Sequence, residues 1–232
     1  MLLSSTALAI IMMGQSSAGQ VARAEEQLRL IDCIETIKED PQTAYDRGLA
    51  WINEGGRPLA RQCTALALVE LGLAAEGAIR LEDLANAANG GSIAQRVIFL
   101  TQAGNAWLIA GKPQAALVTL ENALRLNPHD PNLLADRAAA YIALEQWDNA
   151  ERDLEIALQS LANDKDVLRM RAEARLQQGD LQGAKIDIND AMAIDITDIK
   201  TLNLRGRIRL AEANRADETR ELANSPLIIG TD

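Results

Sequence analysis

Across residues 97–198 the same pattern of small and apolar residues returns three times at a fixed spacing of 34 residues. Four aligned columns show this register: Ala116, Ala150 and Ala184; Leu120, Leu154 and Ile188; Ala123, Ala157 and Ala191; Leu124, Leu158 and Met192. A period of this length is typical of helix hairpins stacked into a solenoid, because a single hairpin cannot bury its apolar face alone. The repeat therefore predicts an all-α solenoid.

The first copy, residues 97–130, has a set of small and large residues at characteristic positions: Leu100, Ala103, Gly104, Trp107, Gly111, Ala116, Leu120, Ala123, Leu124 and Pro128. This set resembles the tetratricopeptide repeat almost position for position. The resemblance implies a right-handed superhelix of helix-turn-helix repeats. Small residues would let paired helices approach closely. In the first helices the small column is Gly104, Ala138, Ala172 and Gly206.

The resemblance divides the chain into an array over residues 92–213, in which 199–213 form a final unpaired helix, and a tail over 214–232. We expect the tail to be a frayed helix end followed by disordered residues. The alternative is that Leu227-Ile228-Ile229 docks on the last helix as a cap. The later copies depart from the pattern at a few positions, namely Arg175 in the column of Trp107 and Tyr141, Glu145 at the turn glycine, and Ala162 and Ile196 in place of Pro128. These departures affect local turns and not the fold.

Residues 25–91 are predicted to be two degenerate copies, because 41–51 and 73–84 repeat the second-helix pattern. Asp40-Pro41 is typical of a helix cap followed by proline in the first turn. Gly72 lies 39 residues before Gly111, five more than one repeat. We therefore expect a longer connection or an extended first helix around residues 88–96, with Ser92 as a cap. The whole chain is predicted to contain about eleven helices.

Residues 1–24 have the outline of a secretory signal peptide: an apolar run over 7–13, then Ala22-Arg23-Ala24 as a small-x-small cleavage site. No Lys or Arg precedes the run, which leaves a mis-assigned start codon or a plain hydrophobic extension as alternatives. We expect cleavage after Ala24 and a periplasmic or secreted protein; the alternative location is cytoplasmic. The run is shorter than the ~20 residues that a bilayer requires, and no later segment qualifies, so we expect no membrane span in the mature chain.

In the tetratricopeptide register, Cys33 and Cys63 occupy first-helix positions of successive copies that face one another across the groove. The resemblance thus implies a disulfide between them in an oxidising compartment. The alternative is two buried thiols that pack as small apolar groups. The absence of a C-x-x-C spacing argues against redox catalysis.

The sequence lacks the motifs of a catalytic, metal or cofactor site. Its one histidine, His129, follows Asn127-Pro128 between predicted helices, and no zinc or general-base set can be built around it by spacing. Nucleotide-binding glycine loops and a calcium loop are also missing from the sequence. A net charge of −10 disfavours nucleic acid and anionic lipid. We therefore expect no enzyme activity, no cofactor and no metal.

Charged residues also recur at the repeat spacing. Arg137, Arg171 and Arg205 share one column, and Asp153 and Asp187 share another on the partner helices. An unpaired buried charge is costly, so these columns predict a ladder of ion pairs between helices. If the side chains of both columns are instead partly exposed to solvent, each ion pair contributes only about 0 to 1 kcal/mol to the stability of the fold.

The resemblance implies a non-enzymatic interaction module that binds a protein or peptide on the surface made by successive first helices. The family's register places seven polar residues there: Asn105, Asn132, Arg169, Glu173, Lys200, Asn203 and Arg207. Three are basic, so we expect an anionic segment or a C-terminal carboxylate to bind there. The alternative is that the basic residues only solubilise the surface and pair with nearby acids. The carboxylate clamp of chaperone-binding relatives is not reproduced, because only Asn105 matches it while Thr101, Asp136 and Met170 do not.

Two other functions stay open. One is an accessory subunit or assembly scaffold for an envelope enzyme complex, bound through the convex face or the ends of the array. The other, more remote, is a hydrolase with an unrecognised site, for which the sequence offers no set of nucleophile, base and orienting residue.

Overall fold

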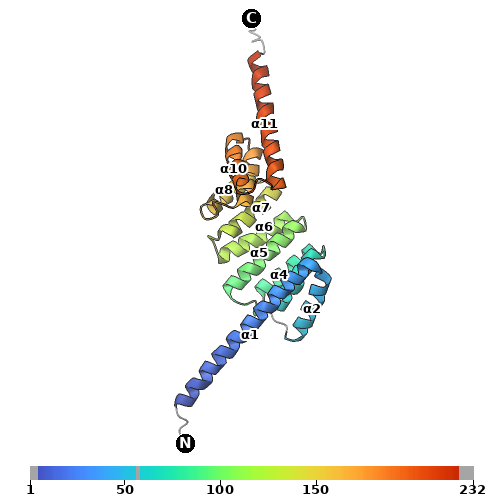
Figure 1. Ribbon diagram of the computed structural model, residues 1–232, viewed down its shortest axis with the longest axis vertical. Helices are drawn as coiled ribbons and strands as arrows, with labels where there is room; N and C mark the ends of the chain where they lie inside the picture. The colour runs from blue at the N-terminus through green and yellow to red at the C-terminus, as the bar shows by residue number, and fades with distance from the viewer. Residues whose placement is uncertain (1–4, 56–57, 225–232) are drawn as a thin grey trace. The chain divides into compact units, whose positions relative to one another are not determined.

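The computed structural model describes residues 5–55 and 58–224, with side chains described over 19–55 and 58–220. These residues contain eleven α-helices and no strand (Figure 1). The helices are α1 (Ser5–Glu39), α2 (Pro41–Asn53), α3 (Pro58–Glu70), α4 (Ala74–Asn86), α5 (Ile93–Ile109), α6 (Pro113–Leu126), α7 (Pro131–Ala143), α8 (Trp147–Leu158), α9 (Lys165–Gln177), α10 (Leu181–Ile194) and α11 (Ile199–Asn224). The predicted all-α fold is confirmed.

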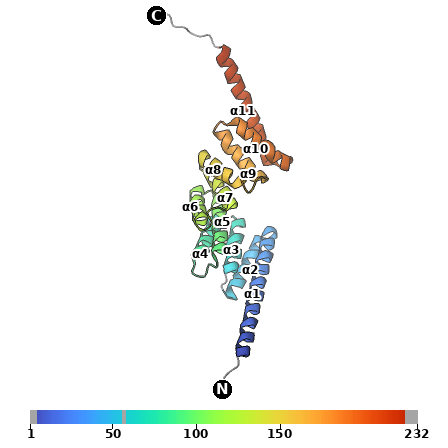
Figure 2. The same ribbon diagram turned by 90° about the vertical axis from the view of Figure 1, so that its left-hand side faces the viewer.

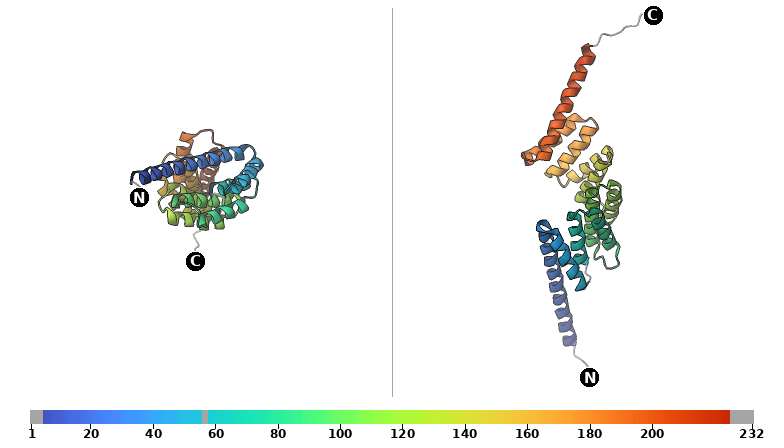
Figure 3. Two further views of the ribbon diagram at one scale, coloured as in Figure 1. Left: turned by 90° about the horizontal axis from the view of Figure 1, so that it is seen from below. Right: turned by 90° about the vertical axis from the view of Figure 1, so that its right-hand side faces the viewer.

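The chain forms two compact units, Met1–Thr119 and Leu120–Asp232, which divide inside α6. In unit 1, α1 pairs with α2 and α3 pairs with α4, and α1 also packs against α3 (Figure 2). In unit 2, α7 pairs with α8, α9 pairs with α10, and α11 packs on α9 and α10 (Figure 3, right). Each unit is therefore built from antiparallel helix hairpins.

Repeat columns of the sequence become the core. Every residue of the four columns that start at Ala116, Leu120, Ala123 and Leu124 has at most 9% of its surface exposed. The alanines of these columns are fully buried, as close approach of paired helices requires. The 34-residue spacing thus marks the residues that pack in the core of each hairpin.

Both predicted helix caps in unit 1 are present. The Asp40 side chain accepts a hydrogen bond from the Thr43 backbone N–H at 3.1 Å, with Pro41 in the first turn of α2. Ser92 and Gln95 form a reciprocal capping box at the start of α5. The extra residues before the regular repeats are shared between a long connection, residues 87–92, and the 17-residue helix α5.

Four of the turns between a first and a second helix contain a left-handed residue, whereas the α1–α2 turn is made by Asp40 with φ of −149°. Gly72, Gly111 and Gly179 have φ of 81°, 68° and 80°, and Glu145 takes the same role with φ of 57°. Glycine adopts this conformation without a steric penalty because it has no Cβ, whereas the Cβ of glutamate comes close to backbone atoms. Glu145 therefore preserves the hairpin at a local cost in stability.

The last helix of the array runs on into the predicted tail. We placed the final helix at 199–213 and expected a frayed helix end at the start of the tail over 214–232; the structure has one helix, α11, from Ile199 to Asn224. The reason is local: the turn position of this copy is Ala213, a strong helix former that does not favour positive φ. The part of the predicted tail beyond 224 lies outside the described residues.

Gly206 also departs from the expected packing of its column. A Cβ built there meets no atom of the described residues within 4 Å, whereas Ala138 and Ala172 of the same column are fully buried. The close approach predicted for this column does not occur at Gly206, because no described helix pairs with α11 on this side.

At the other end, α1 runs from Ser5 through the predicted cleavage site at residues 22–24 to Glu39. Residues 1–4 of the predicted signal peptide lie outside the described residues. Export and cleavage stay predictions. None of the described helices combines the length and the apolar character that crossing a bilayer requires.

Candidate protein-binding surface

An apolar groove of about 510 Å³ opens in unit 1. Its walls are α1, α3 and α5, and Pro41 at the start of α2 closes one side. Because α1, α3 and α5 are the first helices of successive hairpins, the groove lies where the resemblance places the binding surface. The lining residues are Ile34, Ile37, Lys38, Pro41, Leu66, Val69, Glu70, Gln102, Asn105, Ala106 and Ile109.

Most of the groove is aliphatic, with two amides among the apolar side chains. The buried Gln62 donates a hydrogen bond through Nε2 to Oε1 of Gln102 at 2.9 Å, which orients the Gln102 amide. Asn105 makes no hydrogen bond with another described residue. An apolar groove with a few placed polar groups is the usual make-up of a ligand site.

The disulfide fixes two walls of this groove to each other. Cys33 of α1 and Cys63 of α3 are bonded in the structure, with their Cα atoms 6.0 Å apart. That separation suits a disulfide. Both cysteines are buried in a core cluster that contains Cys33, Ile37, Ala44, Trp51, Ala60, Cys63 and Ala67. The bond therefore joins the first helices of the first two hairpins.

The structure distributes the seven predicted groove residues over both units. Asn105 lines the groove of unit 1, and the other six lie in unit 2. Asn132, Lys200 and Asn203 are exposed.

The two predicted groove arginines each have an acidic partner. Arg207 of α11 donates two hydrogen bonds to Glu173 of α9, at 2.6 and 2.7 Å, and Arg169 donates one to Asp166 at 2.8 Å. Burial raises the pKa of Glu173, but the hydrogen bonds from Arg207 and Gln177 outweigh it, so this pKa lies below its usual value. This pairing matches the alternative in which the basic residues pair with nearby acids, and it leaves less positive charge for an anionic segment.

The predicted ladder has two rungs in the structure. Arg137 donates two hydrogen bonds to Asp153, at 2.7 and 2.8 Å, and Arg171 donates two to Asp187, at 2.9 and 2.6 Å. Both aspartates are buried. Arg205, which the sequence placed in the same column, has no ion pair with a described residue. The ion pair thus recurs only in repeats whose second helix, which carries the aspartate, is among the described residues.

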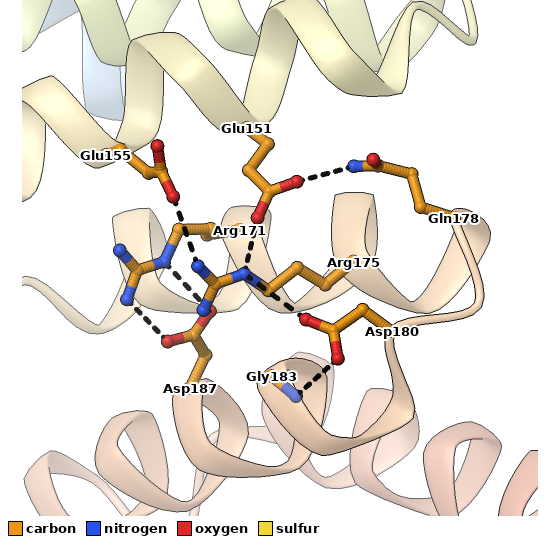
Figure 4. Close-up of polar contacts among 8 residues, drawn as sticks. All are labelled: Glu151, Glu155, Arg171, Arg175, Gln178, Asp180, Gly183 and Asp187. Carbon is orange, nitrogen blue, oxygen red and sulfur yellow. Dashed lines mark hydrogen bonds and ion pairs between the residues drawn. The ribbon is translucent and has the colours of Figure 1, made fainter.

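Arg175 forms a cluster that sequence reasoning missed (Figure 4). It donates to Glu151 at 2.6 Å and Glu155 at 3.3 Å, both on α8, and to Asp187 on α10 at 2.9 Å. Figure 4 shows its guanidinium between α8 and α10, beside that of Arg171. The available signal was the pair of glutamates one helical turn apart on the preceding second helix. Arg175 therefore joins two successive hairpins where an aromatic ring stands in the earlier repeats.

Comparison with known proteins agrees with this architecture. A family model described as tetratricopeptide repeat matches residues 108–173. A thermophilic TPR protein of Thermus thermophilus is similar in structure at 24% identity and a TM-score of 0.59, over 81% of this chain and 99% of that one. MamA of Desulfovibrio magneticus RS-1 is similar at 15% identity and a TM-score of 0.59, over 75% of this chain and 97% of that one. No curated protein matches in sequence.

The hairpins, their buried small-residue columns and their left-handed turns define a helical-repeat solenoid. The match over residues 108–173 supports the tetratricopeptide repeat family for this array.

Proposed function

We propose that this protein is an interaction module that binds a segment of a partner protein in the unit 1 groove. The observation that carries the proposal is the groove itself, about 510 Å³ between three successive first helices. Its aliphatic walls suit one or two apolar side chains of the partner. The amides of Gln102 and Asn105 suit the backbone N–H and C=O groups of an extended segment, which need partners once they leave water.

We further propose that the module works in the cell envelope, as a binding protein or as a scaffold for an envelope enzyme. The apolar run over residues 7–13 and the small-x-small site at 22–24 support export. The geometry of Cys33 and Cys63 supports the same location, because disulfides persist in oxidising compartments.

A matched pair of variants on α5 tests the groove. Ile109 lines the groove and is 65% exposed, whereas Ile98 lies on the same helix outside the groove and is 48% exposed. Replacing either by Asn should leave the fold intact because both side chains are already largely in water. Peptides selected from a random display library on the full chain should bind Ile109→Asn at least about tenfold more weakly than wild type by fluorescence anisotropy. Their affinity for Ile98→Asn should be unchanged.

If the selected peptides bind wild type, Ile109→Asn and Ile98→Asn with equal affinity, the binding site is not this groove. Competition between a selected peptide and reagents that modify Lys38 on the groove rim gives a second measurement, because a bound segment should protect this amine.

A further inference from the structure

The last helix of the array has a face that no described residue covers. Leu202 is 42% exposed and Leu210 is 63% exposed, while Leu134 and Leu168, which share the repeat column of Leu202, are each only 5% exposed. Gly206 lies between the two leucines, four residues from each, so all three share one side of α11. We call Leu202, Arg205, Gly206, Arg209 and Leu210 the α11 face.

Earlier repeats show what covers the same positions. Ala138 and Ala172, in the column of Gly206, are fully buried beneath hairpin packing. At Gly206 a Cβ would meet no atom of the described residues within 4 Å. The α11 face is therefore the first half of a hairpin whose second helix is missing from the described residues.

The two arginines of this face indicate that a helix packed against it would carry a negative charge. Arg205 and Arg209 stand in the columns of Arg171 and Arg175, and both of those contact the buried Asp187 of the following helix. Arg205 and Arg209 have no ion pair with a described residue. They are four residues apart on one helix, where like charges repel. A carboxylate supplied from outside would relieve that repulsion.

The preceding second helix supplies no acid to these arginines among the described residues. Arg175 has Glu151 and Glu155 on α8, but the residues 34 positions later on α10 are Lys185 and Asn189. Lys185 is itself paired with Glu212 of α11 at 2.9 Å. The unsatisfied charge of the α11 face is therefore positive.

We propose that the α11 face binds an acidic amphipathic helix of a partner protein, which completes the hairpin in trans. The helix would carry an aspartate beside an apolar stripe and a small residue opposite Gly206, as α8 and α10 do with Asp153 and Asp187. A second copy of this chain is a poorer occupant, because two α11 faces would bring Arg205 and Arg209 of both copies together. This site lies in unit 2 and does not depend on the groove of unit 1.

The probe is a helix-stabilised, fluorescently labelled peptide with the α10 sequence, residues 181–194, and the same peptide with Asp187→Asn. Binding to the full chain is followed by anisotropy. We expect the aspartate peptide to bind at least about tenfold more tightly than the asparagine peptide. That preference should disappear in the protein variant Arg205→Gln/Arg209→Gln.

A second variant tests the contact itself. Gly206→Leu places a side chain where the partner helix must approach, and its Cβ meets no described atom within 4 Å. It should retain its circular dichroism spectrum and urea midpoint and should lose at least about 90% of peptide binding at a fixed concentration. Thr219→Leu, a neutral exposed position on the opposite side of α11, is the matched control and should bind like wild type.

Three results would overturn the proposal. The first is no peptide binding to wild type. The second is binding that Gly206→Leu leaves unchanged. The third is a dimer in sedimentation equilibrium that Gly206→Leu converts to monomer, which would assign the face to a second copy. The groove variant Ile109→Asn should bind the α10 peptide normally, so failure of the groove proposal and failure of this one are distinguishable.

Discussion

Arg171 and Asp187 form a two-bond ion pair, with Nε to Oδ2 at 2.9 Å and Nη2 to Oδ1 at 2.6 Å, although the Asp187 side chain has no exposed surface. Arg175 adds a third hydrogen bond to Oδ2 of the same carboxylate, at 2.9 Å. Such burial is tolerable because each lost interaction with water is replaced by a charged donor. Asp187 is thus the point where α9 and α10 are joined by charge.

We predict that Asp187→Ala destabilises the protein by about 3 to 5 kcal/mol, because it leaves two partly buried guanidinium groups without this partner. Arg171→Leu should cost less, since Arg175 still satisfies Asp187 and leucine adds apolar surface. Urea unfolding midpoints of both variants measure this order, with the exposed Asp190→Ala on the same helix as control. Strictly additive effects in the double variant would contradict a coupled pair.

Glu145→Gly is predicted to raise stability by about 0.5 to 1 kcal/mol. The left-handed conformation destabilises the folded state by roughly 1 to 2 kcal/mol when the residue is glutamate. Glycine removes this cost, but it loses more backbone entropy on folding, which offsets part of the gain. Glu145→Ala removes the same charge without freeing the backbone, so it should give no gain. Equal thermal midpoints for the glycine and alanine variants would show that the turn is unstrained.

Reduction of the Cys33–Cys63 bond should lower the free energy of unfolding by about 3 to 4 kcal/mol, because the bond closes a loop with a sequence separation of 30. Urea titrations with and without reductant measure the change, and Cys33→Ser/Cys63→Ser should match the reduced protein. Non-reducing peptide mapping should recover the linked pair. Two alkylatable thiols in freshly isolated protein would refute the disulfide.

Export should remove residues 1–24 and leave Glu25 as the N-terminus, because Ala22 and Ala24 supply the small residues of a cleavage site. The intact mass of protein from the envelope fraction measures this directly. Ala24→Leu should block processing at that bond, whereas Ala18→Leu should not. A retained Met1 in a cytosolic pool would end the proposal of an envelope location.

Asp195 should titrate with a pKa of about 2, chiefly because it accepts a hydrogen bond from Lys165 at 2.6 Å and two more from Thr197. A folded-state pKa below the unfolded value of 3.8 means that this carboxylate stabilises the fold above about pH 4 and loses that effect as the pH falls toward 2. Lys165→Met should shift the pKa, followed by NMR, back toward 3.8. An unshifted value in that variant would rule out Lys165 as the main cause.

Much of the fold follows from sequence because hairpin packing is a periodic property. Ala150 and Ala184 are buried in the structure for the reason that their 34-residue spacing indicates, and the Asp40 and Ser92 caps form from side chains three residues from their targets. Local hydrogen bonds and helix periodicity are both readable along the chain. The ion pair of Arg171 with Asp187 is also periodic, since Arg137 and Asp153 repeat it.

The tertiary structure decided what depends on three-dimensional neighbours. Arg175 reaches carboxylates on the helices before and after its own, an arrangement that no single column of the repeat contains. Arg207 forms an ion pair with Glu173 of another helix. Counting Arg207 as a free positive charge, as the sequence alone suggests, therefore overestimates the positive charge of the surface. The sequence by itself determined which residues face the core, because that depends on spacing within one helix. Only the tertiary structure decided which charges are paired and which helix face is left uncovered, because those depend on distances between helices.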